Sequence, residues 1–199
     1  MSIALVKPDL DHLPGYVDAL QRGWSPDNER GKATAREQLA AIGADAAAFV
    51  ASRTDLEARG DPIELPDGSQ VPRLPGFHRW IWDGAFCGNI GLRWQPGTAA
   101  LPPHVLGHIG YGVVPWKRRR GYARQALSLL LPEAAALGLP HVEITTDPGN
   151  VASRRVIEAC GGQLVERFRK LPAYGETEAL RYRIDLTRET EPRTSRLSA

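Results

Sequence analysis

The segment HIGYGVVPWKRRRGYA, residues 108–123, decides the fold of this chain. Its first half alternates the apolar Ile109, Tyr111 and Val113 with small residues, which is the pattern of a strand. Pro115 has no N–H to donate to a ladder and is expected to end that strand. The second half is a basic turn that contains a single glycine, Gly121.

An apolar periodicity follows the basic turn and predicts a helix over residues 121–137. Pro132 lies inside this helix and predicts a bend in it. The first N–H groups of a helix have no intrahelical partner, and the helix dipole favours negative charge there. Gly121 has no Cβ, so an anion can approach the backbone closely. The alternative is a solvated basic run that only begins a helix.

Two motifs in this order resemble the GNAT superfamily of N-acetyltransferases. Arg118-x-x-Gly121-x-Ala123 directly after a strand is similar to its motif A, usually written Q/R-x-x-G-x-G/A. Asn150 and Ser153 match its next signature, N-x-x-A/S, in which the asparagine opens a helix. The resemblance covers residues 70–186 well and the N-terminal third in general outline.

The resemblance implies an α+β fold (α/β in layout) with a mixed, mostly antiparallel sheet of about seven strands, flanked by helices and splayed between strands four and five. Hydrophobic alternation predicts these strands at residues 3–6, 77–82, 86–94, 108–114, 139–146, 163–170 and 179–186. Helices are expected at 12–22, 32–41, 46–53, 121–137 and after Asn150, and a small hairpin at 63–71 around Asp67-Gly68. We expect one acetyltransferase domain over residues 1–186 and a disordered tail over 187–199.

The resemblance also implies a site for acetyl-CoA as co-substrate. The pantetheine arm would pair with backbone near Gly112, Val113 and Val114, and the pyrophosphate would rest on amides of residues 119–124. Asn150 would cap its helix, reach the pantetheine arm, or both. The expected cofactor-binding residues are Val113, Val114, Arg118, Arg119, Arg120, Gly121, Tyr122, Ala123, Arg124, Asn150 and Ser153.

The reaction implied is the attack of a neutral amine on the thioester carbonyl, which requires a base. The candidates are His108, which has a suitable unperturbed pKa, and Glu143, whose pKa burial would have to raise. Trp24 follows the first helix and is a candidate substrate contact, with a packed loop anchor as the alternative. Ile157 stands where many members carry a tyrosine that protonates the departing thiolate, so the acid stays open among Tyr111, Ser153, Cys160 and water.

The whole chain has 199 residues and a net charge of +2, so its basic character is local and predicts no general attraction to nucleic acid. Cys87 and Cys160 form no metal-like or disulfide pattern, which predicts a reducing cytoplasm and no metal. No signal peptide or membrane segment is expected. The acceptor would be a small-molecule or protein amine, and a homodimer is an option by analogy.

Two other functions compete with an active enzyme. The absent tyrosine favours a catalytically silent CoA-binding module, which would bind acetyl-CoA without turnover. A nucleic-acid-binding domain would use the basic run of residues 117–124 and would show a steep salt dependence. That run lacks interleaved aromatic residues, which weakens the nucleic-acid-binding hypothesis.

Overall fold

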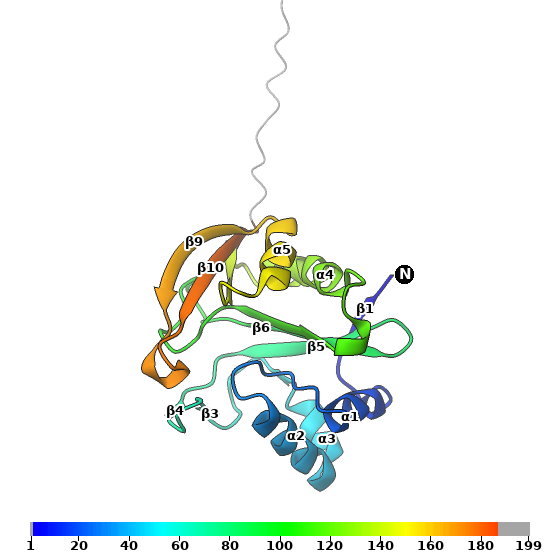
Figure 1. The fold of residues 1–199 in the computed structure, drawn as a ribbon. Helices are drawn as coiled ribbons and strands as arrows, with labels where there is room; N and C mark the ends of the chain where they lie inside the picture. Colours follow the sequence, from blue (N-terminus) through cyan, green and yellow to red (C-terminus); the bar gives the residue numbers. More distant parts are fainter. Residues whose placement is uncertain (1, 187–199) are drawn as a thin grey trace, which may run out of the picture.

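The computed structural model describes residues 2–186 and divides the strands between two sheets (Figure 1). The larger sheet is antiparallel, with the order β1-β5-β6-β7 and the short strand β2 paired to β5. The smaller sheet has the order β8-β10-β9, and β3 and β4 form a separate ribbon. The strands are β1 (Ala4–Val6), β2 (Thr54–Asp55), β3 (Ile63–Glu64), β4 (Gln70–Val71), β5 (Gly76–Trp82), β6 (Phe86–Arg93), β7 (Ile109–Val113), β8 (His141–Thr146), β9 (Gln163–Arg169) and β10 (Glu178–Asp185).

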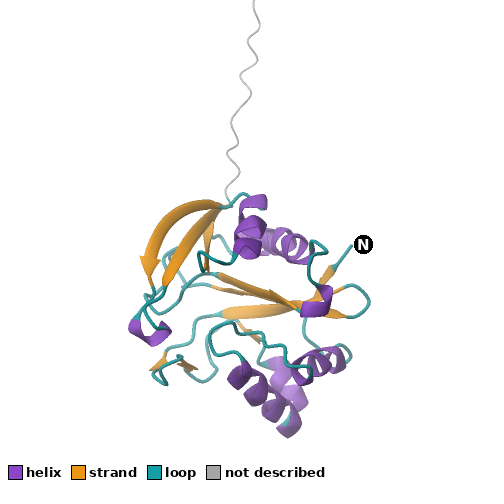
Figure 2. Ribbon diagram, viewed as in Figure 1, coloured by secondary structure: helices purple, strands orange, loops and turns teal. Residues whose placement is uncertain are grey.

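Helices cover both faces of the larger sheet, which makes a layered molecule (Figure 2). The N-terminal helices lie on one face, and the two later helices lie on the other. The helices are α1 (Leu13–Gln21), α2 (Lys32–Ala44), α3 (Ala46–Ala51), α4 (Tyr122–Ala136) and α5 (Val151–Ala159), with 3-10 turns η1 (Pro115–Lys117) and η2 (Pro172–Tyr174).

Each side of the larger sheet has its own hydrophobic core. On the α4 side, Ile90, Leu127 and Leu130 are buried together with residues of β8 and β10. On the α1 side, aromatic residues dominate: the Tyr16 ring stacks on Trp80 with centroids 5.0 Å apart. Burial of these large side chains is the main source of stability, at about 25 cal/mol per Å² of apolar surface. The sheet is therefore clamped from both sides, and β7 is held between the two cores.

The two sheets meet at one point, at the start of β7. The His108 N–H donates to the Glu143 carbonyl oxygen at 2.7 Å, and the Glu143 N–H donates to Nδ1 of the His108 ring at 3.0 Å. Gly107 approaches β8 so closely that a Cβ there would lie 2.9 Å from the Glu143 carbonyl oxygen. Beyond this joint β7 and β8 form no ladder with each other. The splay expected between the fourth and fifth core strands is thus a division into two sheets.

Most of the expected elements form, with differences at their ends. The first helix spans Leu13–Gln21, within the expected range 12–22, and no side chain caps its N-terminus; Asp9 accepts hydrogen bonds from the His12 N–H and ring. Asp45 caps α3 by accepting from the Ala48 N–H. Strand β2 and the two 3-10 turns were not expected from the pattern. The tail of residues 187–199 lies outside the described residues, and within 2–186 no helix is long and apolar enough to cross a membrane.

Candidate functional site

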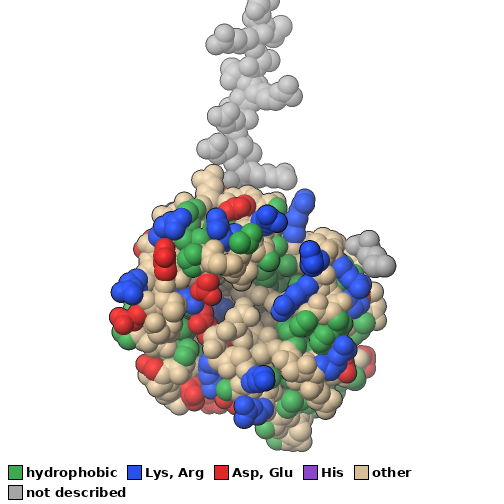
Figure 3. Space-filling model, in the orientation of Figure 1, with side chains coloured by type: hydrophobic (Ala, Val, Ile, Leu, Met, Phe, Trp, Pro, Cys, Tyr) green, Lys and Arg blue, Asp and Glu red, His purple; other side chains and the backbone are tan. Residues whose placement is uncertain are grey.

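A cleft of about 530 Å³ opens where β7 and β8 part. Its walls come from β7, β8, the basic turn before α4 and the first turn of α5. Its other end is closed by residues from the loop after α1 and from the end of β9. Figure 3 shows this face of the molecule hollowed near its centre, with acidic and basic side chains beside the hollow.

One edge of β7 supplies backbone hydrogen-bonding groups to the cleft. The Arg93 N–H donates to the His108 carbonyl and the Val114 N–H donates to the Cys87 carbonyl, so the even-numbered residues bond to β6. Because an antiparallel strand alternates its bonding direction, the N–H and C=O groups of Ile109, Tyr111 and Val113 point toward the cleft. Val114 does not reach the cleft: its N–H is used by β6, and its side chain is fully buried outside the cleft.

The basic turn has an unusual backbone that makes it concave. Arg119 and Gly121 both have left-handed dihedrals, with φ of 64° and 75°. For a residue with a Cβ this conformation costs about 1 to 2 kcal/mol, so the surrounding structure must enforce it at Arg119. Gly121 caps α4 without a side chain, and the first N–H groups of the helix are left for a ligand. This arrangement suits an anion.

A buried ion pair holds the basic turn against the β5–β6 hairpin. Both carboxylate oxygens of Asp83 lie 2.8 Å from Nζ of Lys117, and the Tyr122 hydroxyl donates to Oδ2 at 2.6 Å. Burial by itself would raise the pKa of Asp83, but hydrogen bonds from Lys117, Tyr122 and Cys87 outweigh it and hold the pKa well below its usual range. Lys117 therefore positions the turn, because its charge is already neutralised.

The first turn of α5 forms the opposite wall. The Asn150 side chain accepts from the Ser153 N–H at 3.1 Å, so the capping role expected for Asn150 is present. The Tyr111 hydroxyl crosses from β7 and lies 2.9 Å from the Ser153 Oγ. Burial is the main reason why the pKa of Tyr111 is raised, to about 12. The phenol therefore stays protonated at neutral pH.

A cluster of three charges forms the other end of the cleft and was not expected from the sequence. Nζ of Lys170 lies 2.7 Å from Oε1 of Glu29 and 3.0 Å from Oδ1 of Asp147. Burial lowers the pKa of Lys170, but the two carboxylates outweigh this and raise it. Asn28 lies beside Glu29 on the same wall.

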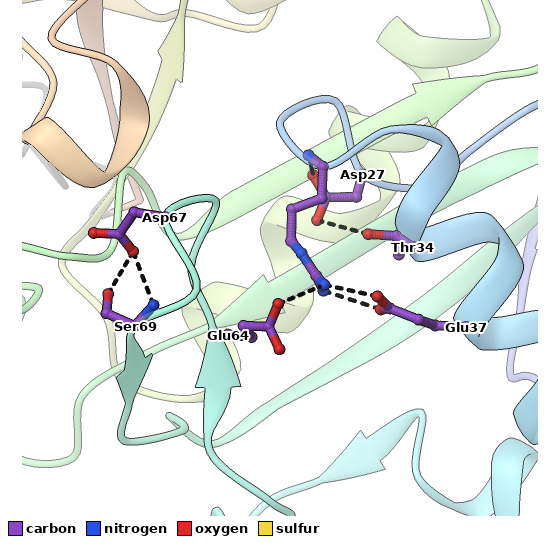
Figure 4. A network of polar contacts seen from close by, with 7 residues as sticks. Asp27, Thr34, Glu37, Glu64, Asp67 and Ser69 are labelled. Atoms are coloured by element: carbon purple, nitrogen blue, oxygen red, sulfur yellow. Dashed lines mark hydrogen bonds and ion pairs between the residues drawn. The ribbon is translucent and has the colours of Figure 1, made fainter.

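The loop that carries Asn28 and Glu29 is fixed by its own hydrogen bonds (Figure 4). Oδ1 of Asp27 accepts from the N–H groups of Glu29 at 2.7 Å and Arg30 at 3.0 Å, while Oδ2 accepts from the Thr34 hydroxyl at 3.4 Å. Arg30 then binds Glu37 on α2 and Glu64 on β3. The loop is therefore preformed on the helical layer.

Neither predicted base lies in the cleft. Glu143 binds Arg183 at 2.8 Å and lies 3.7 Å from Arg181, and it lines a separate cavity beneath β8 and β10. His108 is fully buried, and its Nδ1 already accepts the Glu143 N–H. Burial is the largest cause of its low pKa of about 4. Both residues are thus occupied by the joint between the sheets and by the ion pairs around it.

Trp24 adopts the packed alternative and not the substrate contact. Its side chain is buried in the aromatic core, edge-on to Tyr16 and Phe86. Its ring lies under β7, 3.7 Å from the position that a Cβ of Gly112 would take. It therefore supports the strand from below.

The basic turn and the start of α5 account for nearly all expected cofactor-binding residues that reach the cleft. Those that line it are Val113, Arg118, Arg119, Gly121, Tyr122, Ala123, Arg124, Asn150 and Ser153. Val114 and Arg120 do not. The assignment of these residues to acetyl-CoA stays a prediction. Within residues 2–186 no group of three or more His, Cys, Asp and Glu side chains is placed to hold a metal ion.

A cleft between two diverging strands, lined by the open start of α4, is the arrangement that the resemblance to the GNAT fold predicts. The family model described as "Acetyltransferase (GNAT) domain" matches residues 70–163. The chain belongs to this GNAT superfamily.

Solved structures are similar to the chain over almost its whole length. They include the microcin self-immunity acetyltransferase MccE with acetyl-CoA and AMP (12% identity, 92% of each chain, TM-score 0.60). They also include the ribosomal alpha-N-protein acetyltransferase RimL with coenzyme A (14% identity, 93% of this chain and 94% of that one, TM-score 0.61). A putative ribosomal-protein-serine acetyltransferase from Vibrio cholerae has 15% identity over 93% and 94%, with a TM-score of 0.58. At these identities the likeness shows the fold alone. A search of curated protein sequences gave no match.

Proposed function

We propose that this protein transfers the acetyl group of acetyl-CoA to a primary amine by direct attack in a ternary complex. The observation that carries the proposal is the cleft itself, where the free edge of β7 and the open start of α4 face one cavity. The edge of β7 suits the amides of the pantetheine arm, since buried amides need partners. The start of α4 suits the pyrophosphate.

The acetyl transfer forms a C–N bond to the amine and breaks the C–S bond of the thioester. The attacking amine must be neutral and must lose a proton during the reaction, while the departing sulfur carries negative charge. The carboxylates that line the cleft are Glu29 and Asp147, and both are bound to Lys170. We place the exit of the amine's proton at this end of the cleft, through Glu29 or a water bound to it.

Tyr111 is our candidate for stabilising the departing thiolate, in place of the tyrosine that Ile157 replaces. Its hydroxyl lies in the cleft wall beside Ser153. An ordinary thiol has a pKa of about 8.5, and the pKa of Tyr111 is about 12. The phenol is thus the weaker acid, so it donates a hydrogen bond to the sulfur and keeps its own proton.

Calorimetric titration with acetyl-CoA tests the proposal, with wild type compared to Gly121→Glu. A Cβ at position 121 would meet only the Gln125 side chain, at 3.8 Å, and φ is +75°, so the new carboxylate would occupy the anion site. Gly138→Glu is the matched control, since Gly138 also has open space and a φ of +80° but follows the other end of α4. We expect micromolar binding by wild type and by Gly138→Glu, and none by Gly121→Glu.

The same samples are then tested for release of free thiol from acetyl-CoA in a panel of amines. Thiol release that depends on the presence of an amine supports the proposed acetyltransferase activity. Binding without release from any amine would identify a catalytically silent module. Normal binding by Gly121→Glu would show that the pyrophosphate lies elsewhere.

A further inference from the structure

Two glycines of β7 that line the cleft, Gly110 and Gly112, face the α1 side of the larger sheet. The side chains of Ile109, Tyr111 and Val113 point to the opposite face and pack on the α4 side. The buried Trp24 ring covers Gly112 from below, whereas Gly110 is covered by the end of one exposed side chain, that of Arg93.

Arg93 is the charged group that lies over Gly110 on this face. It is the last residue of β6, and its Nη2 is 3.2 Å from the position that a Cβ of Gly110 would take. Gly110 and Gly112 themselves line the cleft. The guanidinium thus stands at the edge of the cleft, on the side that does not carry the basic turn.

The Arg93 side chain is exposed to solvent. Desolvation by the surrounding protein is nevertheless the largest cause of its lowered pKa, which Tyr174 and Asp27 partly offset.

The Arg93 guanidinium has no direct partner among residues 2–186: its side chain makes no hydrogen bond and no ion pair there, and Asp27 attracts it only from beyond ion-pair distance. The nearby Asp27 carboxylate is taken by the backbone of its own loop and by Thr34, as Figure 4 shows for Thr34. The other cation at this end, Lys170, is held between Glu29 and Asp147.

The surroundings of Arg93 add positive potential. The half-buried His78 ring has a pKa of about 3, mainly because of desolvation and then because of the charges of Arg53, Arg93 and Arg73. Arg53 has no carboxylate partner in the described part of the chain and lies over the Phe49 ring. An anionic group is favoured at such a place, and arginine binds a carboxylate with two parallel hydrogen bonds.

We propose that Arg93 binds a carboxylate of the acceptor, so that the substrate is an amine that also carries a carboxylate group. This inference rests on the proposed acetyltransferase function and names its substrate class. The carboxylate belongs either to a free amino acid or to an acidic residue at the start of a peptide. The amine then lies in the cleft, beside the backbone of Gly110 and Gly112 that lines it.

Matched pairs of amines test this directly through thiol release from acetyl-CoA. One arm compares free amino acids with their carboxamides, and the other compares peptides that begin with Asp or Glu with those that begin with Asn or Gln. We expect kcat/KM to favour the carboxylate by about tenfold or more in at least one arm, as for a charged hydrogen bond. The arm that shows the preference identifies the source of the carboxylate.

The variant Arg93→Gln should reduce that preference to near unity and leave the affinity for acetyl-CoA unchanged. Arg93→Lys should retain part of it, because it keeps the charge and loses the paired hydrogen bonds. Arg36→Gln is the control, since Arg36 is an exposed arginine on α2; we expect wild-type kinetics from it.

The outcomes separate the two proposals. Thiol release without a carboxylate preference, or a preference that survives in Arg93→Gln, overturns the role of Arg93 and leaves the acetyltransferase intact. If the protein binds acetyl-CoA but none of the amines in either arm causes thiol release, both the role of Arg93 and the acetyltransferase function are overturned.

Discussion

Asp83 is the residue whose loss should disturb the cofactor site most without touching the cofactor. The change Asp83→Asn keeps the shape of the side chain and removes its charge. Lys117 then loses a partner at 2.8 Å in a pair whose side chains are only 18% and 8% exposed. Breaking a buried pair costs about 3 to 5 kcal/mol, and the partial exposure of Lys117 reduces this to about 2 to 3 kcal/mol.

That loss should be visible as a lower melting temperature. For a chain of this size, each 1 kcal/mol shifts Tm by about 2 to 4 °C, so we expect a fall of roughly 5 to 10 °C. The affinity for acetyl-CoA should also fall, because Lys117 and Tyr122 flank the turn that carries Gly121. Differential scanning calorimetry and acetyl-CoA titration measure the two effects on the same protein.

The pH dependence of the unfolding free energy gives an independent test of the negative charge on Asp83. The pKa of folded Asp83 lies below its unfolded value of about 4. A carboxylate of this kind contributes stability that is fully present above the unfolded pKa and is lost as pH falls toward the folded one. The difference in unfolding free energy between wild type and Asp83→Asn should therefore be constant near neutrality and narrow progressively below about pH 4.

The control is Asp18→Asn, which removes another aspartate from an ion pair. The Asp18–Arg22 pair is an exposed helical pair with side chains 61% and 50% exposed, so its loss should cost under about 0.5 kcal/mol. Equal melting temperatures for the two variants would refute the assignment of Asp83 as the residue that anchors the turn. The same holds if the difference in unfolding free energy between wild type and Asp83→Asn does not change with pH.

Two further changes test the joint and the cleft wall. Gly107→Ala would place a Cβ 2.9 Å from the Glu143 carbonyl oxygen and 3.2 Å from the Thr145 nitrogen, and it should destabilise the protein by about 1 to 3 kcal/mol in urea unfolding. Gly149→Ala, which has nothing within 4 Å, should stay near wild type, and equal effects at both positions would contradict the close approach of the two sheets. Tyr111→Phe should lower kcat by about tenfold or more, as for a hydrogen bond to a charged group, and leave acetyl-CoA affinity unchanged. A wild-type kcat would remove Tyr111 from the reaction.

The cofactor end of the cleft could be predicted from sequence because its signals are local. A strand, a basic turn with Gly121 and a helix start lie within one short segment, and each step has a known physical consequence. The unexpected part is the left-handed backbone at Arg119, since no glycine marks it. The Asn150 cap was equally readable from its position before α5.

The end of the cleft that holds Lys170 could not be predicted, because it is assembled from distant segments. Lys170 meets Glu29 across 141 residues of sequence, and Arg93 meets Gly110 only through the β6–β7 register. Glu143 lies outside the cleft for a geometric reason. The alternation along β8 correctly predicts that Val142 and Ile144 are buried, but side chains stand perpendicular to a sheet while the cleft opens in its plane. The strands therefore present their backbone edges to the cleft, and a strand side chain reaches it only from the face that borders it, as Tyr111 does, whereas Glu143 faces the other cavity.

The two faces of β7 explain why a direct transfer suits this molecule. Ile109, Tyr111 and Val113 fill the α4 side and leave their backbone edge toward the cleft, where a thioester arm would lie. Gly110 and Gly112 face the α1 side, where Arg93 lies over Gly110 and Trp24 packs against Gly112. Donor and acceptor would therefore meet in the cleft beside the same short strand and would need no covalent enzyme intermediate. Orientation of two bound reactants contributes up to about 7 to 11 kcal/mol to a rate in favourable cases. A site without a strong base in the cleft would depend on that contribution.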